Sequence, residues 1–241
     1  MTHFGIIGNP LKQSFSANYF TEKFLRENIN AEYTLYPLDN IEQFPGLIKQ
    51  HNFRGLNVTI PYKQAVMPYL DSLDDTAKAI GAVNVILFKD NSLIGYNTDT
   101  LGFIEDIKPL IHPHHTKALV LGTGGAAKAV RYALTRLNIE VHLVSRSIGY
   151  DYTYSSIDKQ TLQEHLLIVN CTPLGMYPDT DSCPDLPYQY LTPQHLCYDV
   201  IYNPAPTLFL RKAAAQGAVI QSGIGMLHGQ AEEAWKIWKN I

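Results

Sequence analysis

The chain has 241 residues, enough for one large domain or for two of about 120 residues that each bury a core. Hydrophobic residues make up 46% and charged residues 17%, a balance typical of globular enzymes that excludes a disordered or coiled-coil chain. The formal net charge of −3 provides no overall attraction to nucleic acid or to an anionic membrane.

Cysteine usage and the N-terminal sequence indicate a cellular compartment. Cys171, Cys183 and Cys197 form no CxxC pair, which argues against a disulfide framework or a zinc site and favours a reducing environment. The start MTHFGIIGNPLK has no basic n-region and only a short apolar run, unlike a signal peptide, and no segment approaches the roughly 18 apolar residues of a membrane helix. We therefore expect a cytoplasmic protein without a membrane anchor.

Apolar periodicity predicts an α/β domain in the first part of the chain. Strands are expected at 3–8, 32–38 and 54–60, helices at 16–28, 41–51 and 74–82, and a hairpin at 83–97 around Asp90 and Asn91. A helix at 99–110 leads to the segment IHPHHT, which looks like a connector between domains. Its three histidines are a poor metal site, because Pro113 lies among them and no acid or thiol is nearby.

A second α/β domain is predicted from Thr116 onward. It opens with KALVLGTGGAAKAVRYALTRLN, which reads as a strand, a glycine turn and a helix. Further strands are expected at EVHLVSR, LLIVNCT, LCYDVIY and AVIQS. Their apolar, β-branched character favours a parallel sheet covered by helices on both faces.

The glycine turn is a candidate dinucleotide site. Gly122, Gly124 and Gly125 lie between strand and helix, where a pyrophosphate must approach the backbone N–H groups and a Cβ would occupy its space. Ala126 and Ala127 permit close packing of the helix on the strand. The spacing departs from GxGxxG, so a purely structural glycine turn is the alternative.

The end of the next strand bears on the choice of cofactor. Chains that bind NAD carry an acid there for the ribose 2′-hydroxyl, whereas this chain has Ser145, Arg146 and Ser147. A guanidinium between two hydroxyls suits a 2′-phosphate and favours NADP. A solvated surface arginine is the alternative.

Polar stretches follow several elements of the first domain: KQSFS, NVTIPYK, GAVN and GYNTDT. Their hydroxyls, amides, lysine and aspartate suit a small polyhydroxylated substrate that carries a carboxylate. Each stretch also has an ordinary structural explanation, with Ser16 as a helix cap, Asn84 as a turn former and Asp99 as a cap of the next helix.

Eight stretches together resemble the shikimate dehydrogenase family over essentially the whole chain and in the family's order. They are GNPLKQSFS, NVTIPYK, GAVN, GYNTDTLGF, LGTGGAAKA, NCTPLGM, DVIYNP and GIGMLHGQA. The resemblance implies a substrate domain over 1–100, a Rossmann-type doubly wound NADP-binding domain over 101–222, and a C-terminal helix over 223–241 that returns to the first domain. The implied activity is the reversible, NADPH-dependent reduction of 3-dehydroshikimate to shikimate, in the biosynthesis of chorismate and the aromatic amino acids.

The same resemblance implies roles for individual residues. Lys63 and Asp99 match the catalytic pair, with Lys63 either transferring a proton or stabilising the developing alkoxide. The implied substrate ligands are Ser14, Ser16, Thr59, Asn84, Tyr202 and Gln230. The implied cofactor ligands are Gly122, Thr123, Gly124, Gly125, Ala126, Ser145, Arg146, Ser147, Asn170 and Thr172. No metal is implied, and the expected form is a monomer or homodimer that binds a small molecule and no nucleic acid.

Two departures from the family pattern are visible. Ala17 stands where members often have proline, and the usual Asn-Arg-Thr with a further basic residue is here Ser145-Arg146-Ser147 with no second cation shortly after. The second departure predicts a weaker preference for NADP than is usual. The alternatives are an NAD-dependent quinate/shikimate dehydrogenase and a non-catalytic dinucleotide-binding module on the same fold.

Overall fold

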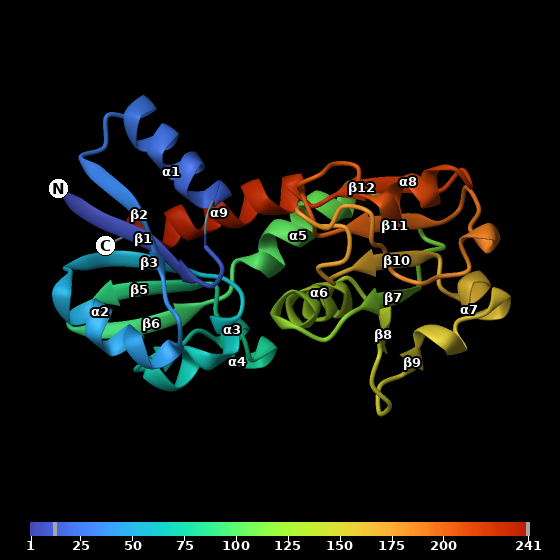
Figure 1. Ribbon diagram of the computed structural model, residues 1–241, viewed down its shortest axis with the longest axis horizontal. Helices are drawn as coiled ribbons and strands as arrows, with labels where there is room; N and C mark the ends of the chain where they lie inside the picture. The colour runs from blue at the N-terminus through green and yellow to red at the C-terminus, as the bar shows by residue number, and fades with distance from the viewer. Residues whose placement is uncertain (12–13, 240–241) are drawn as a thin grey trace. The chain divides into compact units, whose positions relative to one another are not determined.

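The computed structural model describes residues 1–11 and 14–239, which divide into two compact units. Unit 1 consists of Met1–Thr98 and the chain from Ala231 onward, and unit 2 consists of Asp99–Gln230 (Figure 1). Helix α9 (Ile224–Lys239) begins in unit 2 and ends in unit 1. None of the helices in the described part of the chain is both long enough and apolar enough to cross a membrane.

Unit 1 is built on a six-stranded mixed sheet in the order β2-β1-β3-β5-β6-β4. β1 pairs in parallel with β2 and β3, whereas β5 runs antiparallel to β3 and β6. Asp90 and Asn91 both have positive φ, as a two-residue turn between β5 and β6 requires, so the predicted hairpin is confirmed. The strands are β1 (Thr2–Gly8), β2 (Ala31–Pro37), β3 (Phe53–Val58), β4 (Ser72–Leu73), β5 (Val85–Lys89) and β6 (Ser92–Tyr96).

Helices cover both faces of this sheet because strand side chains alternate between the faces. Phe4 and Val85 pack with α1 and with Trp238 of α9, while Ile7 and Ile86 pack with α2, α3 and α4. The helices are α1 (Phe15–Arg26), α2 (Phe44–Gln50), α3 (Tyr62–Ala65) and α4 (Asp75–Ile80). The helix predicted at 41–51 starts as a 3₁₀ turn, Ile41–Gln43, and becomes α2 at Phe44, with a proline in its first turn.

Unit 2 is built on a parallel sheet in the order β12-β11-β10-β7-β8-β9. Since β7 is its first strand along the chain, this is the 3-2-1-4-5-6 order of a doubly wound dinucleotide-binding sheet, which confirms the predicted fold class. The strands are β7 (Lys117–Leu121), β8 (Glu140–Ser145), β9 (Tyr152–Thr153), β10 (Leu167–Asn170), β11 (Leu196–Asp199) and β12 (Val219–Ser222).

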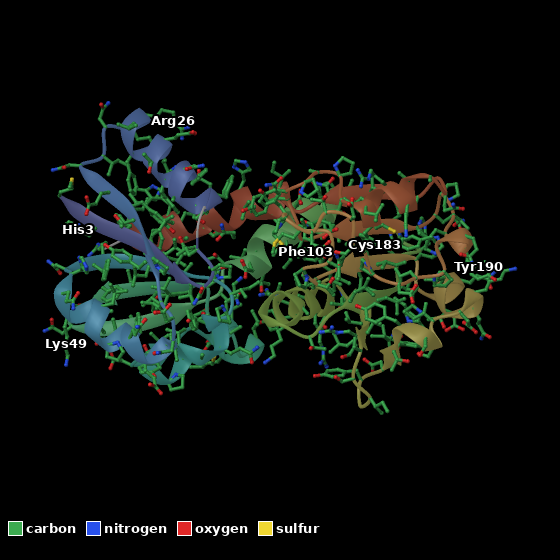
Figure 2. All side chains as sticks on the ribbon, viewed as in Figure 1. His3, Arg26, Lys49, Phe103, Cys183 and Tyr190 are labelled. Atoms are coloured by element: carbon green, nitrogen blue, oxygen red, sulfur yellow. The ribbon has the colours of Figure 1, made fainter. Side chains whose placement is uncertain are left out.

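The apolar residues of this sheet pack on helices at both faces. α5 (Asp99–Ile107), α6 (Gly125–Arg136) and the start of α9 cover one face, and α7 (Lys159–Glu164) and α8 (Leu208–Ala214) cover the other. Phe103 of α5, labelled in Figure 2, lies against Tyr198 of β11 with ring centroids 4.9 Å apart. The segment 111–116, expected to connect domains, lies inside unit 2, where His115 is 5% exposed and hydrogen-bonds to the Gln194 carbonyl.

Candidate active site

In unit 1 the polar residues predicted from sequence gather where β1 and β3 end. The N–H of Thr59, just after β3, donates to the Ile7 carbonyl of β1. Lys63 lies in α3, the single helical turn that follows Pro61, and its carbonyl accepts a 2.7 Å hydrogen bond from the Val83 N–H. The chain around Lys63 is therefore fixed against the segment that carries Asn84.

Asn84 is the centre of this arrangement and is 3% exposed. Its Oδ1 accepts from the Thr98 N–H at 2.8 Å, its Nδ2 donates to the Thr98 hydroxyl at 3.0 Å, and its carbonyl accepts from the Val58 N–H. Thr98 directly precedes Asp99, the first residue of α5. Asn84 thus ties the strand before Lys63 to Thr98, at the end of the first part of unit 1.

A second set of buried polar side chains lies at the start of α1. Ser14 is the residue before the helix, and its side chain makes no capping hydrogen bond, whereas Ser16 is the second helical residue and is 6% exposed. Ser16 hydrogen-bonds to the Tyr33 hydroxyl, which donates to Asn57 Oδ1 at 2.6 Å. Ser16 is therefore not the cap of α1, and its position depends on Tyr33.

Gln230 and Asp99 belong to two helices of unit 2 that pack very closely. A Cβ on Gly102 of α5 would lie 2.5 Å from the Met226 carbonyl and 2.7 Å from the Gln230 nitrogen of α9. Because Gly102 is one helical turn from Asp99, this crossing places Gln230 near the first turn of α5. Tyr202, in the segment after β11, is 38% exposed.

The turn between β7 and α6 fits a dinucleotide pyrophosphate. Gly122 has φ +106°, which favours glycine, and a Cβ on Gly124 would meet nothing within 4 Å, so the space before α6 is open. No side chain caps α6, and its first N–H groups are left for an anion. Ala127 is buried against the sheet, as close helix packing requires.

The segment after β8 presents the predicted 2′-phosphate residues. Ser145 is 9% exposed and its hydroxyl accepts from the Ser147 N–H at 3.1 Å, while Arg146 and Ser147 are exposed. Burial raises the pKa of the Tyr154 hydroxyl, and the positive charge of Arg146 opposes that rise. The Arg146 guanidinium is therefore at the surface, close enough to Tyr154 to lower the pKa of its hydroxyl.

Asn170 and Thr172 are held by a buried carboxylate that sequence reasoning missed. Asp199, 0% exposed, accepts hydrogen bonds from Asn170 Nδ2, the Ile201 N–H and the Thr207 hydroxyl. Asn170 is also 0% exposed, and its Oδ1 accepts from the N–H and hydroxyl of Thr172. Asn170 thus shapes the loop after β10 through Thr172.

Tyr33, Asn57 and Asp199 are the polar residues that the sequence interpretation did not assign. Tyr33 belongs to an ordinary strand pattern, and nothing in the sequence around it indicates a role in the site. Asp199 interrupts the buried run LCYDVIY, and an acid in such a run was a usable signal, because a buried carboxylate needs hydrogen-bond donors.

The chain is similar to known proteins along its whole length. The family model described as the shikimate dehydrogenase substrate binding domain matches residues 6–86. The shikimate dehydrogenase (NADP(+)) of Desulforamulus reducens is 37% identical, over 97% of this chain and 88% of its own. The solved shikimate dehydrogenase of Aquifex aeolicus has a TM-score of 0.90 at 32% identity, covering 100% of this chain and 93% of its own. The shikimate 5-dehydrogenase of Thermus thermophilus, solved in complex with NADP(H) and shikimate, has a TM-score of 0.88 at 32% identity, covering 100% and 94%.

Proposed function

The chain belongs to the shikimate dehydrogenase family, and we propose that it catalyses the reversible reduction of 3-dehydroshikimate to shikimate with NADPH. The observation that carries the proposal is the set of hydrogen bonds around Asn84, which joins the strand before Lys63 to Thr98, the residue before Asp99.

The chain's residues have distinct tasks in this reaction. NADPH, when bound on the glycine turn, supplies the hydride. Lys63 stabilises the negative charge that develops on the C3 oxygen and supports delivery of a proton to it. Asp99 orients the Lys63 ammonium and accepts a hydrogen bond from a neighbouring substrate hydroxyl. The remaining substrate contacts are assigned to Ser14, Ser16, Thr59, Asn84, Tyr202 and Gln230.

The direct test is the initial rate of cofactor reduction by the purified protein with shikimate and NADP. The same assay is run with NAD in place of NADP and with quinate in place of shikimate. We expect strong preference for shikimate with NADP. Comparable rates with NAD or quinate would assign the chain to the broader quinate/shikimate type, and no turnover by folded protein with any pair would refute catalysis.

Replacing Lys63 tests the chemical assignment. Lys63→Ala should lower kcat by about 10²- to 10⁴-fold while changing the affinity for shikimate far less, because the lost interaction strengthens in the transition state. Lys49→Ala, which removes an exposed lysine of α2 (Figure 2), is the matched control and should leave kcat unchanged. An unaltered kcat in Lys63→Ala would exclude Lys63 from the chemistry.

We also infer that the protein works in a reducing compartment, the cytoplasm, as a monomer or homodimer. All three cysteines are free, and burial raises the pKa of the Cys197 thiol to about 12, which keeps it protonated and unreactive. Light scattering after size-exclusion chromatography measures the oligomeric state, and a mass above that of a dimer would contradict this inference.

A further inference from the structure

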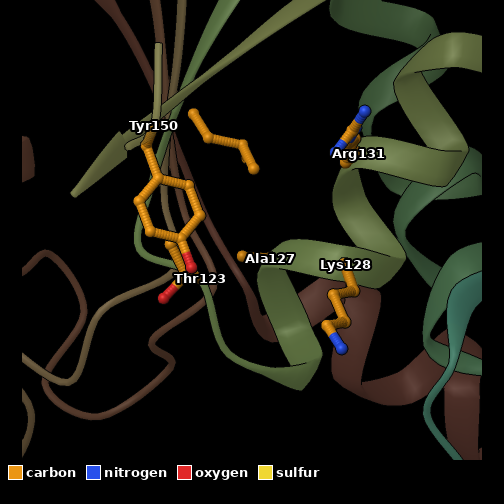
Figure 3. A pocket seen from close by; sticks show the side chains of 6 residues that line it. Thr123, Ala127, Lys128, Arg131 and Tyr150 are labelled. Carbon is orange, nitrogen blue, oxygen red and sulfur yellow. The ribbon is translucent and has the colours of Figure 1, made fainter. Parts of the chain in front are cut away.

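Unit 2 contains a cavity of about 160 Å³ beside the glycine turn, on the α6 side of the sheet. Its lining residues are Thr123 of the turn, Ala127, Lys128 and Arg131 of α6, Leu143 of β8, and Tyr150 of the segment after β8. Figure 3 shows the hydroxyl end of Tyr150 pointing toward Thr123, with Lys128 and Arg131 projecting from α6 on the other side. The cavity therefore combines two cations and two hydroxyls, and no acid lines it.

The segment after β8 carries little positive charge of its own. Arg146 is the only lysine or arginine between Ser145 and Asp158. The one acid near it, Asp151, is turned back onto the sheet, where its Oδ2 accepts from the Leu143 N–H at 2.7 Å. A phosphate monoester carries close to two negative charges at neutral pH, so one exposed arginine compensates only part of its charge.

We propose that this cavity binds the 2′-phosphate of NADP, with Arg131 and Lys128 supplying the positive charge that the β8 segment lacks. The inference rests on the proposed use of NADP. Preference for NADP over NAD would then depend on α6 as well as on Arg146.

The position of the two cations on α6 supports this assignment. Lys128 and Arg131 are three residues apart, so they lie on one face of the helix. Long helical side chains point back toward the N-terminus, which here is the glycine turn. Arg131 is exposed, and within the described residues its guanidinium makes no ion pair that a phosphate would have to displace.

Direct binding of two nucleotides isolates the 2′-phosphate. Adenosine 2′,5′-bisphosphate and adenosine 5′-monophosphate differ only in that group, and calorimetric titration measures both without shikimate. Arg131→Gln should weaken binding of the bisphosphate by about 5- to 50-fold and binding of the monophosphate by less than about two-fold. Lys128→Gln should act in the same direction, and the double variant should reduce the salt dependence of bisphosphate binding.

Arg136→Gln is the matched control, because Arg136 is an exposed arginine of the last turn of α6 that does not line the cavity. It should change neither affinity. The assignment would be overturned if Arg131→Gln lost affinity equally for both nucleotides, or if Arg131→Gln and Arg136→Gln had equal effects. Equal affinity of the wild type for both nucleotides would also overturn it. A wild type that discriminates between them but does not oxidise shikimate would instead contradict the proposed function alone.

Discussion

Tyr33 shows how one buried hydroxyl can set the geometry of a binding residue. It accepts from Ser16 and donates to Asn57 Oδ1, and Asn57 Nδ2 in turn donates to the Asn84 carbonyl at 3.3 Å. Burial raises the pKa of Tyr33 well above its usual value, so the hydroxyl keeps its proton and remains a donor. Ser16 and Asn84 are thus joined through two residues that need not touch substrate.

Removing this hydroxyl should affect stability and substrate binding together. Tyr33→Phe leaves Asn57 Oδ1 without its donor and should lower the free energy of unfolding by about 1–3 kcal/mol. It should also raise KM for shikimate more than it lowers kcat, because Ser16 loses its restraint. Fluorescence of Trp235 and Trp238, both in unit 1, reports the unfolding.

Tyr190→Phe is the control for this substitution, since Tyr190 is 37% exposed and lies in unit 2 (Figure 2). It should change neither quantity. A normal KM in a destabilised Tyr33→Phe protein would limit Tyr33 to a structural role.

The close crossing of helices α5 and α9 depends on glycines, which carry no side chain. Gly102 contacts the backbone of α9, and a Cβ on Gly229 would lie 2.8 Å from the Gly102 Cα. A second contact is made by Asp106, which accepts from the Met226 N–H in the first turn of α9 and from the Tyr198 hydroxyl. The carboxylate satisfies an N–H group that a helix start leaves open.

A methyl group at the crossing should separate the two helices. Gly102→Ala should destabilise the protein by about 1–3 kcal/mol through overpacking, and should raise KM for shikimate because Gln230 moves with α9. Gly46→Ala is the control, because a Cβ at this position would meet nothing within 4 Å. Alanine is the better helix former, so this variant should gain about 0.5–1 kcal/mol in free energy of unfolding. Circular dichroism during urea unfolding measures the stability of both variants. If Gly102→Ala unfolds at the same urea concentration as the wild type, the close crossing of α5 and α9 is contradicted.

The buried Asp199 should make the stability of the protein depend on pH. Burial raises its pKa from 3.8 to about 6, against the effect of its three donors. Between these two values the folded chain holds a proton that the unfolded chain releases, so stability falls as pH rises through this window. A pKa change of this size corresponds to about 2–3 kcal/mol in the free energy of unfolding.

Asp199→Asn should remove this contribution while leaving Asn170 and Ile201 an oxygen to bond. Stability of the wild type relative to Asp199→Asn should therefore fall by about 2–3 kcal/mol between pH 4 and pH 7. Urea unfolding followed by circular dichroism at several pH values checks this. The exposed Asp185→Asn should give a profile parallel to the wild type, and a parallel profile for Asp199→Asn itself would refute the effect.

Sequence patterns predicted the parts of the fold that have periodicity. Long apolar strands, the glycine turn and the hairpin at Asp90 and Asn91 were predicted because several neighbouring residues report the same structure. The single turn of α3 was not, since four residues cannot show a helical period. The short β9 and the helices α7 and α8 were also missed.

The candidate site was predictable only as a set of separate residues. Its members were named from motifs, and none of these motifs encodes which side chains meet. The link from Ser16 to Asn57 through Tyr33 depends on packing between β2, β3 and α1, which are distant in sequence.

The division of α9 between the two units has a consequence for synthesis on the ribosome. Trp238 is 1% exposed, its Nε1 donates to the Ile86 carbonyl, and its ring lies 5.0 Å from that of Phe4. A nascent chain that has not yet reached Trp238 lacks this part of the core of unit 1, although the strands of unit 1 emerge first. Unit 1 should therefore stay open to proteases and chaperones until translation has passed α9, after unit 2 has already had its whole sequence available to fold.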